Sequence, residues 1–438
     1  MLFSLTNPEV AIMMMGIFLF AVLLGFPIAF TLMAMGLGFG YYAYFDPTKM
    51  EHLFDNRIFQ LFVQNTYTVM DNNVLTAVPL FLFMGYLVER AGIVAKLFFA
   101  IRLASHKLPA SMAVAALITC ALFSTATGII GAVVTLMGLL AWPAMIKAGY
   151  DKKFASGIIC SGGCLGILIP PSIMLIVYSV IAQLSPLRLF AAAIFPGLML
   201  AGLYIGYAIF RAWMNPSIAP KPAAEEIPPT AVIMKEVLVS FLPLFSLIIL
   251  VLGTILAGIA TPAEAAAVGA FGSLVLSYFY KTLKWKNFKE SVFLTAKTTA
   301  MIMWLFIGSW TFASVFSYLG GHEVFEHFFK SLNLQPWQFL VITQLIIFLL
   351  GWPLEWTEIL IIFVPIFLPL VEFFGVNPYF FAMLIALNLQ TSFLTPPMAM
   401  SAYYLKGVQS KNVELMEIFG GIMPCLLYTS DAADESVS

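Results

Sequence analysis

Two proline pairs that interrupt apolar segments constrain the fold of this chain more than any other feature. Pro170–Pro171 and Pro396–Pro397 lie 226 residues apart, in a match that extends over 36 residues. Within it, Pro143, Gly149, Phe154 and Tyr178 recur as Pro369, Gly375, Phe380 and Tyr404. Proline lacks an N–H group and clashes with the preceding turn, so each pair breaks a helix and frees backbone carbonyls. In a bilayer, freed carbonyls survive only where protein covers them or where they line a polar cavity. A single Pro–Pro pair, taken alone, is usually an ordinary proline kink. The shared register of the two pairs predicts two matched helix breaks instead.

The composition indicates a membrane protein. Of 438 residues, 61% are hydrophobic and 10% are charged, against about 25% charged in soluble domains. Repeated apolar runs approach the 18–20 residues that cross a bilayer, so we expect an all-α polytopic protein embedded in lipid. The net charge of −1 gives no reason to expect nucleic acid as a partner. The first apolar run has no small-residue cleavage site, so no cleavable signal peptide is expected.

The expected elements fall into two halves joined by a proline-rich segment. We assign 1–212 to a first repeat, 213–235 to a cytoplasmic linker and 236–427 to a second repeat. The expected spans are 10–25, 27–45, 74–88, 94–105, 150–183, 187–212, 237–257, 262–280, 293–318, 377–405 and the partial 413–427. Segments 52–70 and 284–292 suit helices that lie along the membrane surface. We expect the last helix to be truncated after Leu427 and residues 428–438 to form an atypical tail, foreign to the rest of the chain.

Two further apolar stretches, 110–146 and 336–373, are interrupted halfway. Each is too long for one span and its arms are short for two, which predicts two re-entrant helical hairpins. Sixteen of the 21 Lys and Arg residues can be placed on one face, which is cytoplasmic by the positive-inside rule. The first hairpin then enters from the cytoplasm and the second from outside. Two halves of opposite topology, with broken helices at 150–183 and 377–405, predict the inverted repeats of a secondary transporter.

The first hairpin tip offers oxygen atoms at membrane depth. A hard cation such as Na⁺ needs oxygen donors, and half-helix N-termini carry partial positive charge for anions. The candidate Na⁺ ligands are Ser124, Thr125, Thr127 and Gly128 at the tip, with Gly166 and Ile169 in the first break. The alternative is that the hydroxyls simply bond back to helix carbonyls, as is common in membrane helices.

The second tip contains an acidic residue, Glu355, in an apolar segment. A carboxylate at membrane depth costs about 2.5 kcal/mol or more, so it marks a functional site by default. Three roles stay open: a Na⁺ ligand, a carrier of a coupling proton, or a cap on the second helix of the hairpin. Glu358 is a weaker candidate at the mouth. The candidate Na⁺ ligands of this half are Glu355, Trp356 and Thr357 at the tip, with Thr391 and Thr395 in the second break.

The substrate is expected between the two breaks, since matched interruptions in two halves point to a transporter's binding site. The candidate substrate-binding residues are Pro170, Ser172, Asn388, Ser392 and Pro396.

Other motifs have simpler explanations. Thr261–Glu264 reads as a helix-capping box, with Pro at the first helical position. His322 and His327 are spaced i, i+5, which separates them by about 140° around a helix and argues against a zinc site. The chain contains no GxxxxGK[ST] phosphate loop and no G-x-S-x-G elbow, so neither ATP hydrolysis nor hydrolase chemistry is expected. We expect no enzyme activity and no cofactor, with Na⁺ as a coupling ion.

Six ordered motifs resemble one family, the large membrane subunit (DctM-like) of tripartite ATP-independent periplasmic (TRAP) transporters. They are Phe123–Gly128, Pro143–Tyr150, Leu165–Ser172, Thr261–Ala267, Val364–Pro369 and Asn388–Pro397, and the resemblance covers residues 8–425. This chain departs from the family at two points. The first tip is commonly richer in Gly and Ser, and the second commonly has Asp where this chain has Glu355.

The resemblance implies a function and partners. It implies an elevator mechanism with Na⁺ coupling in the bacterial inner membrane, with both hairpins on a mobile domain. It also implies a small four-helix membrane subunit and a periplasmic binding protein that delivers an organic anion such as a dicarboxylate. Two alternatives stay open: a stand-alone Na⁺- or H⁺-coupled anion carrier of the same superfamily, and an intramembrane enzyme, for which no catalytic dyad is visible.

Overall fold

The computed structural model describes residues 6–48, 50–220, 229–410 and 412–435, and within these ranges it contains helices and no strands. The expected all-α class is therefore confirmed. The first half contains α1 (Asn7–Leu23), α2 (Ile28–Ala43), the 3₁₀-helix η1 (Leu53–Asp55), α3 (Arg57–Met70), α4 (Ala77–Arg90), α5 (Ile93–Ala104), α6 (Ser111–Thr127), α7 (Ile130–Lys147), α8 (Lys152–Cys164), the 3₁₀-helix η2 (Leu165–Ile167), α9 (Ile173–Ile181) and α10 (Pro186–Met214).

The second half begins after the proline-rich segment. It contains α11 (Thr230–Leu256), α12 (Pro262–Phe279), α13 (Trp285–Tyr318), α14 (Gly321–Ser331), α15 (Pro336–Leu350), α16 (Trp356–Glu358), the π-helix η3 (Ile359–Phe363), α17 (Val364–Phe373), α18 (Pro378–Ser392), α19 (Met400–Val408) and α20 (Leu415–Glu435). The predicted capping box opens α12: the Thr261 N–H donates to Glu264 at 2.7 Å, and the Glu264 N–H donates to the Thr261 hydroxyl at 3.3 Å.

Six helices of the described chain are long and apolar enough to cross a bilayer. They are Ile130–Lys147, Pro186–Met214, Ala231–Leu256, Pro262–Phe279, Trp285–Tyr318 and Trp356–Phe373. A seventh is added if α4 and α5, which are bent by 63°, count as one span. The described chain therefore has enough long apolar helices for the polytopic architecture expected from composition.

Both predicted helix breaks are present. In the first, α8 and η2 stop at Ile167 and α9 starts at Ile173; in the second, α18 stops at Ser392 and α19 starts at Met400. Each interruption contains its proline pair, and both Pro–Pro peptide bonds are cis. The non-helical backbone is almost fully buried in the first break, which satisfies the requirement that protein cover it.

The two expected hairpins each consist of two helical arms. In the first, only Gly128 and Ile129 separate α6 from α7. In the second, five residues, 351–355, separate α15 from the continuous run α16–η3–α17. That these pairs re-enter the membrane stays a prediction.

Left-handed glycines mark corresponding places in the two halves. Six of the seven described glycines with positive φ form three pairs, Gly25 with Gly258, Gly92 with Gly320 and Gly149 with Gly375. The members of these pairs are 233, 228 and 226 residues apart. Only glycine adopts this conformation without a Cβ penalty, so each pair indicates the same turn in both halves. The seventh is Gly128, at the first hairpin tip.

The C-terminal helix packs backbone to backbone against the first broken helix. A Cβ added to Gly421 would lie 1.9 Å from the Lys153 carbonyl oxygen, and one added to Gly157 would lie 2.1 Å from the Gly421 carbonyl oxygen. Membrane helices associate through such small-residue contacts, because lipid offers no hydrophobic driving force between them. α20 and α8 are therefore held closer than any side chain permits.

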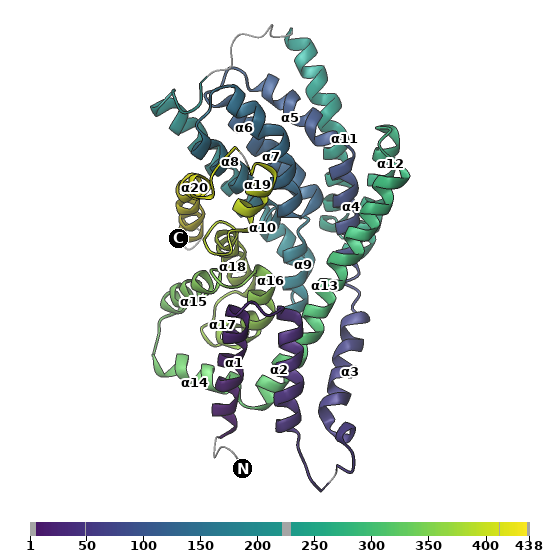
Figure 1. The fold of residues 1–438 in the computed structure, drawn as a ribbon, viewed down its shortest axis with the longest axis vertical. Coiled ribbons are helices and arrows are strands. Elements are labelled where there is room, and N and C mark those ends of the chain that lie inside the picture. Colours follow the sequence, from purple (N-terminus) through teal and green to yellow (C-terminus); the bar gives the residue numbers. More distant parts are fainter. Residues whose placement is uncertain (1–5, 49, 221–228, 411, 436–438) are drawn as a thin grey trace.

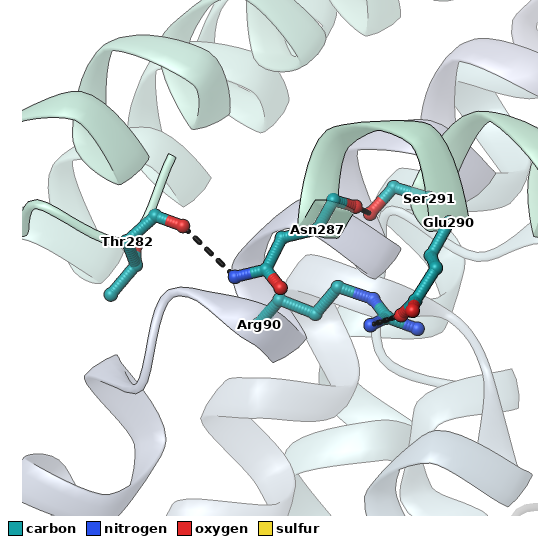
Figure 2. Close-up of polar contacts among 5 residues, drawn as sticks. All are labelled: Arg90, Thr282, Asn287, Glu290 and Ser291. Atoms are coloured by element: carbon teal, nitrogen blue, oxygen red, sulfur yellow. Dashed lines mark hydrogen bonds and ion pairs between the residues drawn. The ribbon is translucent and has the colours of Figure 1, made fainter. Parts of the chain in front are cut away.

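The prediction of a separate surface helix at 284–292 is wrong. These residues are the first turns of α13, which continues without interruption from Trp285 to Tyr318. The segment contains no proline, so nothing ends the helix at the membrane boundary. Figure 2 shows how its polar side chains are used: Asn287 donates to the Thr282 carbonyl at 2.9 Å, Ser291 donates to the Asn287 carbonyl at 2.9 Å, and Glu290 pairs with Arg90 at the end of α4.

Two expected boundaries also move. The last helix does not stop after Leu427, because α20 continues to Glu435; its hydrogen bonds are local and do not require an apolar sequence. Residues 436–438 of the expected tail lie outside the described residues. Helices enter the proposed linker 213–235 from both sides, since α10 ends at Met214 and α11 starts at Thr230 after the cap Pro229. Residues 221–228 of that linker are likewise outside the described ranges.

Candidate functional site

A cavity of about 220 Å³ lies where both hairpin tips and both helix breaks meet. Two helices from outside the hairpins, α4 and α13, complete its wall. Its lining residues are Leu82, Tyr86, Gly128, Ile129, Ile130, Gly131, Ile167, Ile173, Met174, Thr298, Met301, Ile302, Glu355, Trp356, Thr357, Phe393 and Tyr404. Elements that are far apart in the sequence therefore converge on one space.

The first tip is held against both α4 and the first break. Gly85 of α4 lies so close to Thr127 that an added Cβ would be 2.9 Å from its Cα and carbonyl oxygen. Gly166 approaches Ser124 in the same way: a Cβ added to Gly166 would lie 2.9 Å from Ser124 Cβ. Two glycines thus allow the tip to contact its neighbours directly, and the expected proximity of this tip to the first break is observed.

The hydroxyls of the first tip differ in their partners. Thr125 donates to the Leu122 carbonyl at 2.7 Å and Thr127 donates to the Phe123 carbonyl at 3.1 Å, as the alternative to cation binding predicts. Thr127 Oγ1 also accepts from the Ile129 N–H at 3.5 Å. Ser124 Oγ is buried and has no hydrogen-bond partner among the described residues. An unpaired buried hydroxyl is costly, so Ser124 is the strongest ligand candidate at this tip.

Two helices start at the cavity. α7 begins at Ile130 directly after the first tip, and α9 begins at Ile173 directly after the first break. Ser172 is the N-cap of α9: its Oγ accepts from the Leu175 N–H at 3.4 Å and donates to the Ile167 carbonyl at 2.5 Å. The first N–H groups of a helix have no intrahelical partner and carry the positive end of its dipole.

The second tip exposes three consecutive residues, Glu355, Trp356 and Thr357, to the cavity. Glu355 precedes α16, but its side chain makes no capping hydrogen bond, so the capping role considered for it is not observed. Thr357 Oγ1 and Glu358 Oε2 are buried, and neither has a hydrogen-bond partner within the described chain. Glu358 is 3% exposed, so the expectation that it lies at the mouth is wrong.

A π-helix follows this tip. Its i, i+5 hydrogen bonds over Ile359–Phe363 change the helical register, a feature that is frequent at functional sites. The Ile361 carbonyl accepts a hydrogen bond at 3.2 Å from Ser309 of α13. α13 therefore contacts the second hairpin as α4 contacts the first.

Just before the second break, a hydrogen-bonded amide pair links α18 to α15. Asn388 Nδ2 donates to the carbonyl and to Oε1 of Gln344, at 2.7 and 2.8 Å. The hydroxyls of Thr391, Ser392 and Thr395 donate to carbonyls of their own helix at 2.6 to 2.9 Å. A Cβ added to Gly351 would lie 2.9 Å from Ser392 Cβ, a close approach like that of Ser124 to Gly166.

Only some candidate residues line the cavity. Gly128, Glu355, Trp356 and Thr357 do, whereas the lining does not include the other candidate Na⁺ ligands, which are Ser124, Thr125, Thr127, Gly166, Ile169, Thr391 and Thr395. The five candidate substrate residues, Pro170, Ser172, Asn388, Ser392 and Pro396, are also absent from the lining.

Sequence reasoning missed the contribution of α4 and α13. Tyr86 and Thr298 face each other across 212 residues of chain, with 3.1 Å between their hydroxyl oxygens. Neither residue belongs to a motif, so no sequence signal singled it out. Tyr404 is different, because it is the last residue of the repeated proline register and could have been named.

The unpaired oxygens near the two tips fit a hard cation. They are Ser124 Oγ, Thr357 Oγ1, Glu358 Oε2 and Gln390 Oε1, all buried. Hydroxyl, carboxylate and amide oxygens are the donors that such ions prefer, and buried polar atoms without partners call for an explanation. These residues could hold Na⁺, and a bound ion would satisfy their oxygen atoms.

Among the described residues, helices without strands and six potential spans are the architecture of a multi-pass membrane protein. The model of the tripartite ATP-independent periplasmic transporter family, DctM component, matches residues 15–432. This chain therefore belongs to the DctM family of transporter permease subunits and is not an enzyme.

Curated relatives agree with this assignment. The chain is 29% identical to the C4-dicarboxylate TRAP transporter large permease protein DctM of Pseudomonas aeruginosa, over 78% of this chain and 79% of that protein. It is 30% identical to the sialic acid TRAP transporter large permease protein SiaM of Vibrio cholerae, over 82% of each. It is also 30% identical to the isethionate TRAP transporter permease protein DctMQ of Oleidesulfovibrio alaskensis, over 80% of this chain and 55% of that one.

Two solved structures share the fold at low sequence identity. The Alcanivorax borkumensis YdaH transporter has a TM-score of 0.60 at 14% identity, covering 93% of this chain and 95% of that one. Neisseria gonorrhoeae MtrF has a TM-score of 0.57 at 12% identity, covering 99% and 94%.

Proposed function

We propose that this chain is the large subunit of a Na⁺-coupled secondary transporter that imports an organic anion across the bacterial inner membrane. The cavity between the two hairpin tips carries the proposal, because helix N-termini suited to an anion start at it, and buried, unpaired oxygens suited to Na⁺ lie in the tip segments beside it. Both kinds of ligand would then bind where both helix breaks meet, which couples their binding in one site.

The proposal includes inverted repeats. Three pairs of left-handed glycines at similar separations support it. So do the two close approaches, Ser124 to Gly166 and Gly351 to Ser392, because Gly166 and Ser392 are 226 residues apart. In Figure 1, α1 starts at the lower end of the long axis and α11 starts at the upper end, while α5 and α14 lie at opposite ends. Two halves of opposite orientation explain this arrangement.

An elevator movement is part of the same proposal. Both hairpins and both broken helices would slide as one body past α4 and α13. Two of the contacts that would have to change are made without large side chains: Gly85 against Thr127 in the first half, and Ser309 to the Ile361 carbonyl in the second. Smooth contacts of this kind suit sliding better than interlocked ones.

The relatives support the partners and the substrate class. Their names give C4-dicarboxylate, sialic acid and isethionate as substrates, and all three are organic anions. The family name describes a tripartite transporter, which supports a small membrane subunit and a periplasmic binding protein as partners. Exposed aromatic residues on α12, Phe271 and Tyr278, are 68% and 70% exposed and offer a surface that a membrane subunit would cover.

Reconstituted uptake tests the proposal. The full-length chain is placed in liposomes with the small subunit and binding protein encoded beside it. The ligand that co-purifies with the binding protein, identified by mass spectrometry, serves as the radiolabelled substrate. We expect uptake only when the binding protein and an inward Na⁺ gradient are both present, with a steep dependence on Na⁺ concentration.

The controls separate the alternatives. Undiminished uptake in Na⁺-free buffer with a proton gradient would contradict Na⁺ coupling. Full uptake of free substrate by this chain alone would favour the stand-alone carrier and contradict both partners.

A further inference from the structure

The charge of the cavity lining restricts the ligand. Glu355 is acidic, and none of the described lining residues is Lys, Arg or His. A bound anion therefore has no cationic side chain to pair with inside the cavity. Its charge must be met by backbone N–H groups and hydroxyls, which together neutralise one carboxylate more readily than two.

One place in the cavity suits a carboxylate. Ile130 and Gly131 are the first two residues of α7, Ile173 and Met174 are the first two residues of α9, and all four line the cavity. The N–H groups of a first helical turn bind anions through direct hydrogen bonds and the helix dipole. Thr357 provides an independent observation: this residue lines the same cavity and is 2% exposed, and its buried hydroxyl lacks a partner among the described residues.

The remaining wall is mostly apolar and aromatic, with polar groups at Thr298, Glu355 and the hydroxyls of Tyr86 and Tyr404. Leu82, Ile167, Ile302 and Phe393 offer aliphatic and ring carbon, and the rings of Tyr86, Trp356 and Tyr404 complete the surface. Tyr404 lies directly over Gly131, where an added Cβ would be 2.9 Å from the ring. A ligand hydroxyl placed against most of this surface would be buried without a hydrogen bond.

The volume sets the size. A dry apolar cavity of about 150 Å³ binds benzene, so a cavity of about 220 Å³ has room for a ring with a short acidic side chain. We infer that this permease takes a monocarboxylate with an apolar or aromatic body, whose carboxylate lies between the N-termini of α7 and α9 beside Thr357. The inference rests on the proposed function and narrows its substrate class.

Other anions fit this cavity less well. A short dicarboxylate would bring its second charge against either apolar side chains or Glu355, and both are unfavourable. A polyhydroxylated acid would bury more hydroxyls than the few polar groups of the wall can pair, and unpaired polar groups are rejected strongly.

Ligand-dependent melting of the full-length protein, purified with any subunit that accompanies it, tests the inference. Four probes are compared in Na⁺ buffer: phenylacetate, its neutral analogue phenylacetamide, succinate and gluconate. Binding to the native state raises the melting temperature. We expect phenylacetate to raise it and the other three to have little effect. An equal or larger rise with succinate or gluconate would overturn the inference, and so would no rise with any of the four.

Variants check the placement of the carboxylate. Thr357→Val should weaken phenylacetate binding about tenfold or more, the loss of one hydrogen bond to a charged group. Unchanged phenylacetate binding would overturn the placement. Thr343→Val is the matched control, because Thr343 is also buried but bonds to the Phe339 carbonyl at 2.9 Å and lies outside the cavity.

A second variant covers the case in which Thr357→Val does not fold. Met301 lines the cavity but is 49% exposed, so Met301→Trp should fold and fill part of the space. It should abolish the phenylacetate shift, and an unchanged shift would contradict the site. The reconstituted uptake assay tests the proposed function separately. Uptake of the natural substrate without Na⁺ and without the binding protein would contradict that function and would leave the melting results unaffected.

Discussion

The contact between α8 and α20 leads to a sharp prediction about helix packing. Gly421→Ala places a methyl carbon 1.9 Å from the Lys153 carbonyl oxygen, 2.7 Å from its carbon and 2.9 Å from Ser156 Oγ. Ordinary contact begins at 3.4 Å. The helices must therefore separate by up to about 1.5 Å, because a carbonyl oxygen within a helix cannot rotate away.

The cost follows from the contacts that this separation loosens. A gap of 0.5–1 Å already forfeits a quarter to a half of each atom pair's dispersion energy, and dispersion is the main force that holds membrane helices together. Overpacking usually costs about 1–3 kcal/mol. We expect Gly421→Ala to lie at the upper end, about 3 kcal/mol, which corresponds to a fall of roughly 3 °C in melting temperature for a chain of this length.

The neighbouring glycine is a matched control. An added Cβ at Gly420 would be 3.6 Å from Lys153 Cδ, an ordinary contact with a flexible side chain. Gly420→Ala should therefore leave the melting temperature unchanged or raise it slightly, since Ala favours helix over Gly by up to about 1 kcal/mol. Melting of the two purified variants in one detergent decides the matter. Equal melting temperatures would refute the reasoning.

Three further predictions concern charged and titratable groups. Glu355→Gln should fold, but its apparent Na⁺ affinity, measured from the rise in melting temperature with Na⁺ concentration, should fall about ten- to a hundredfold. Glu372 is exposed, so Glu372→Gln should respond to Na⁺ like the unmodified protein. Equal Na⁺ responses of the two variants would contradict the assignment of Glu355 as a Na⁺ ligand. A double-mutant cycle of Arg90→Ala and Glu290→Ala should give a coupling energy of at most about 1 kcal/mol. The two side chains are 25% and 41% exposed, so water screens their charges. A coupling energy of several kcal/mol would contradict this prediction. Burial lowers the pKa of His322 on α14, so folding disfavours its protonated form, and the stability of the protein should fall as pH drops below the ordinary His pKa of about 6.5. His322→Phe should flatten the dependence of melting temperature on pH between 8 and 5. An unchanged slope would show that His322 is not the group responsible.

Local sequence was sufficient for the features that depend on backbone chemistry. The proline pairs interrupt their helices because proline cannot donate the required hydrogen bond, and the structure has both breaks. The capping box at Thr261–Glu264 depends on residues three positions apart and is present. The error at 284–292 is of a different kind: its polar composition suggested a surface helix, but α13 passes straight through it. Composition indicates the surroundings of a helix and does not say where it ends.

The sequence by itself determined that this chain crosses a membrane, that it breaks two helices at matched places and that oxygen atoms gather at its hairpin tips. Only the tertiary structure decided which helices close the cavity. Tyr86 and Thr298 meet although 212 residues separate them, and Gly85 admits Thr127 at backbone distance. The physical reason is that an apolar helix face in a membrane is equally compatible with lipid and with protein. The pattern of one helix shows what it can bury, and the packed fold selects the partner.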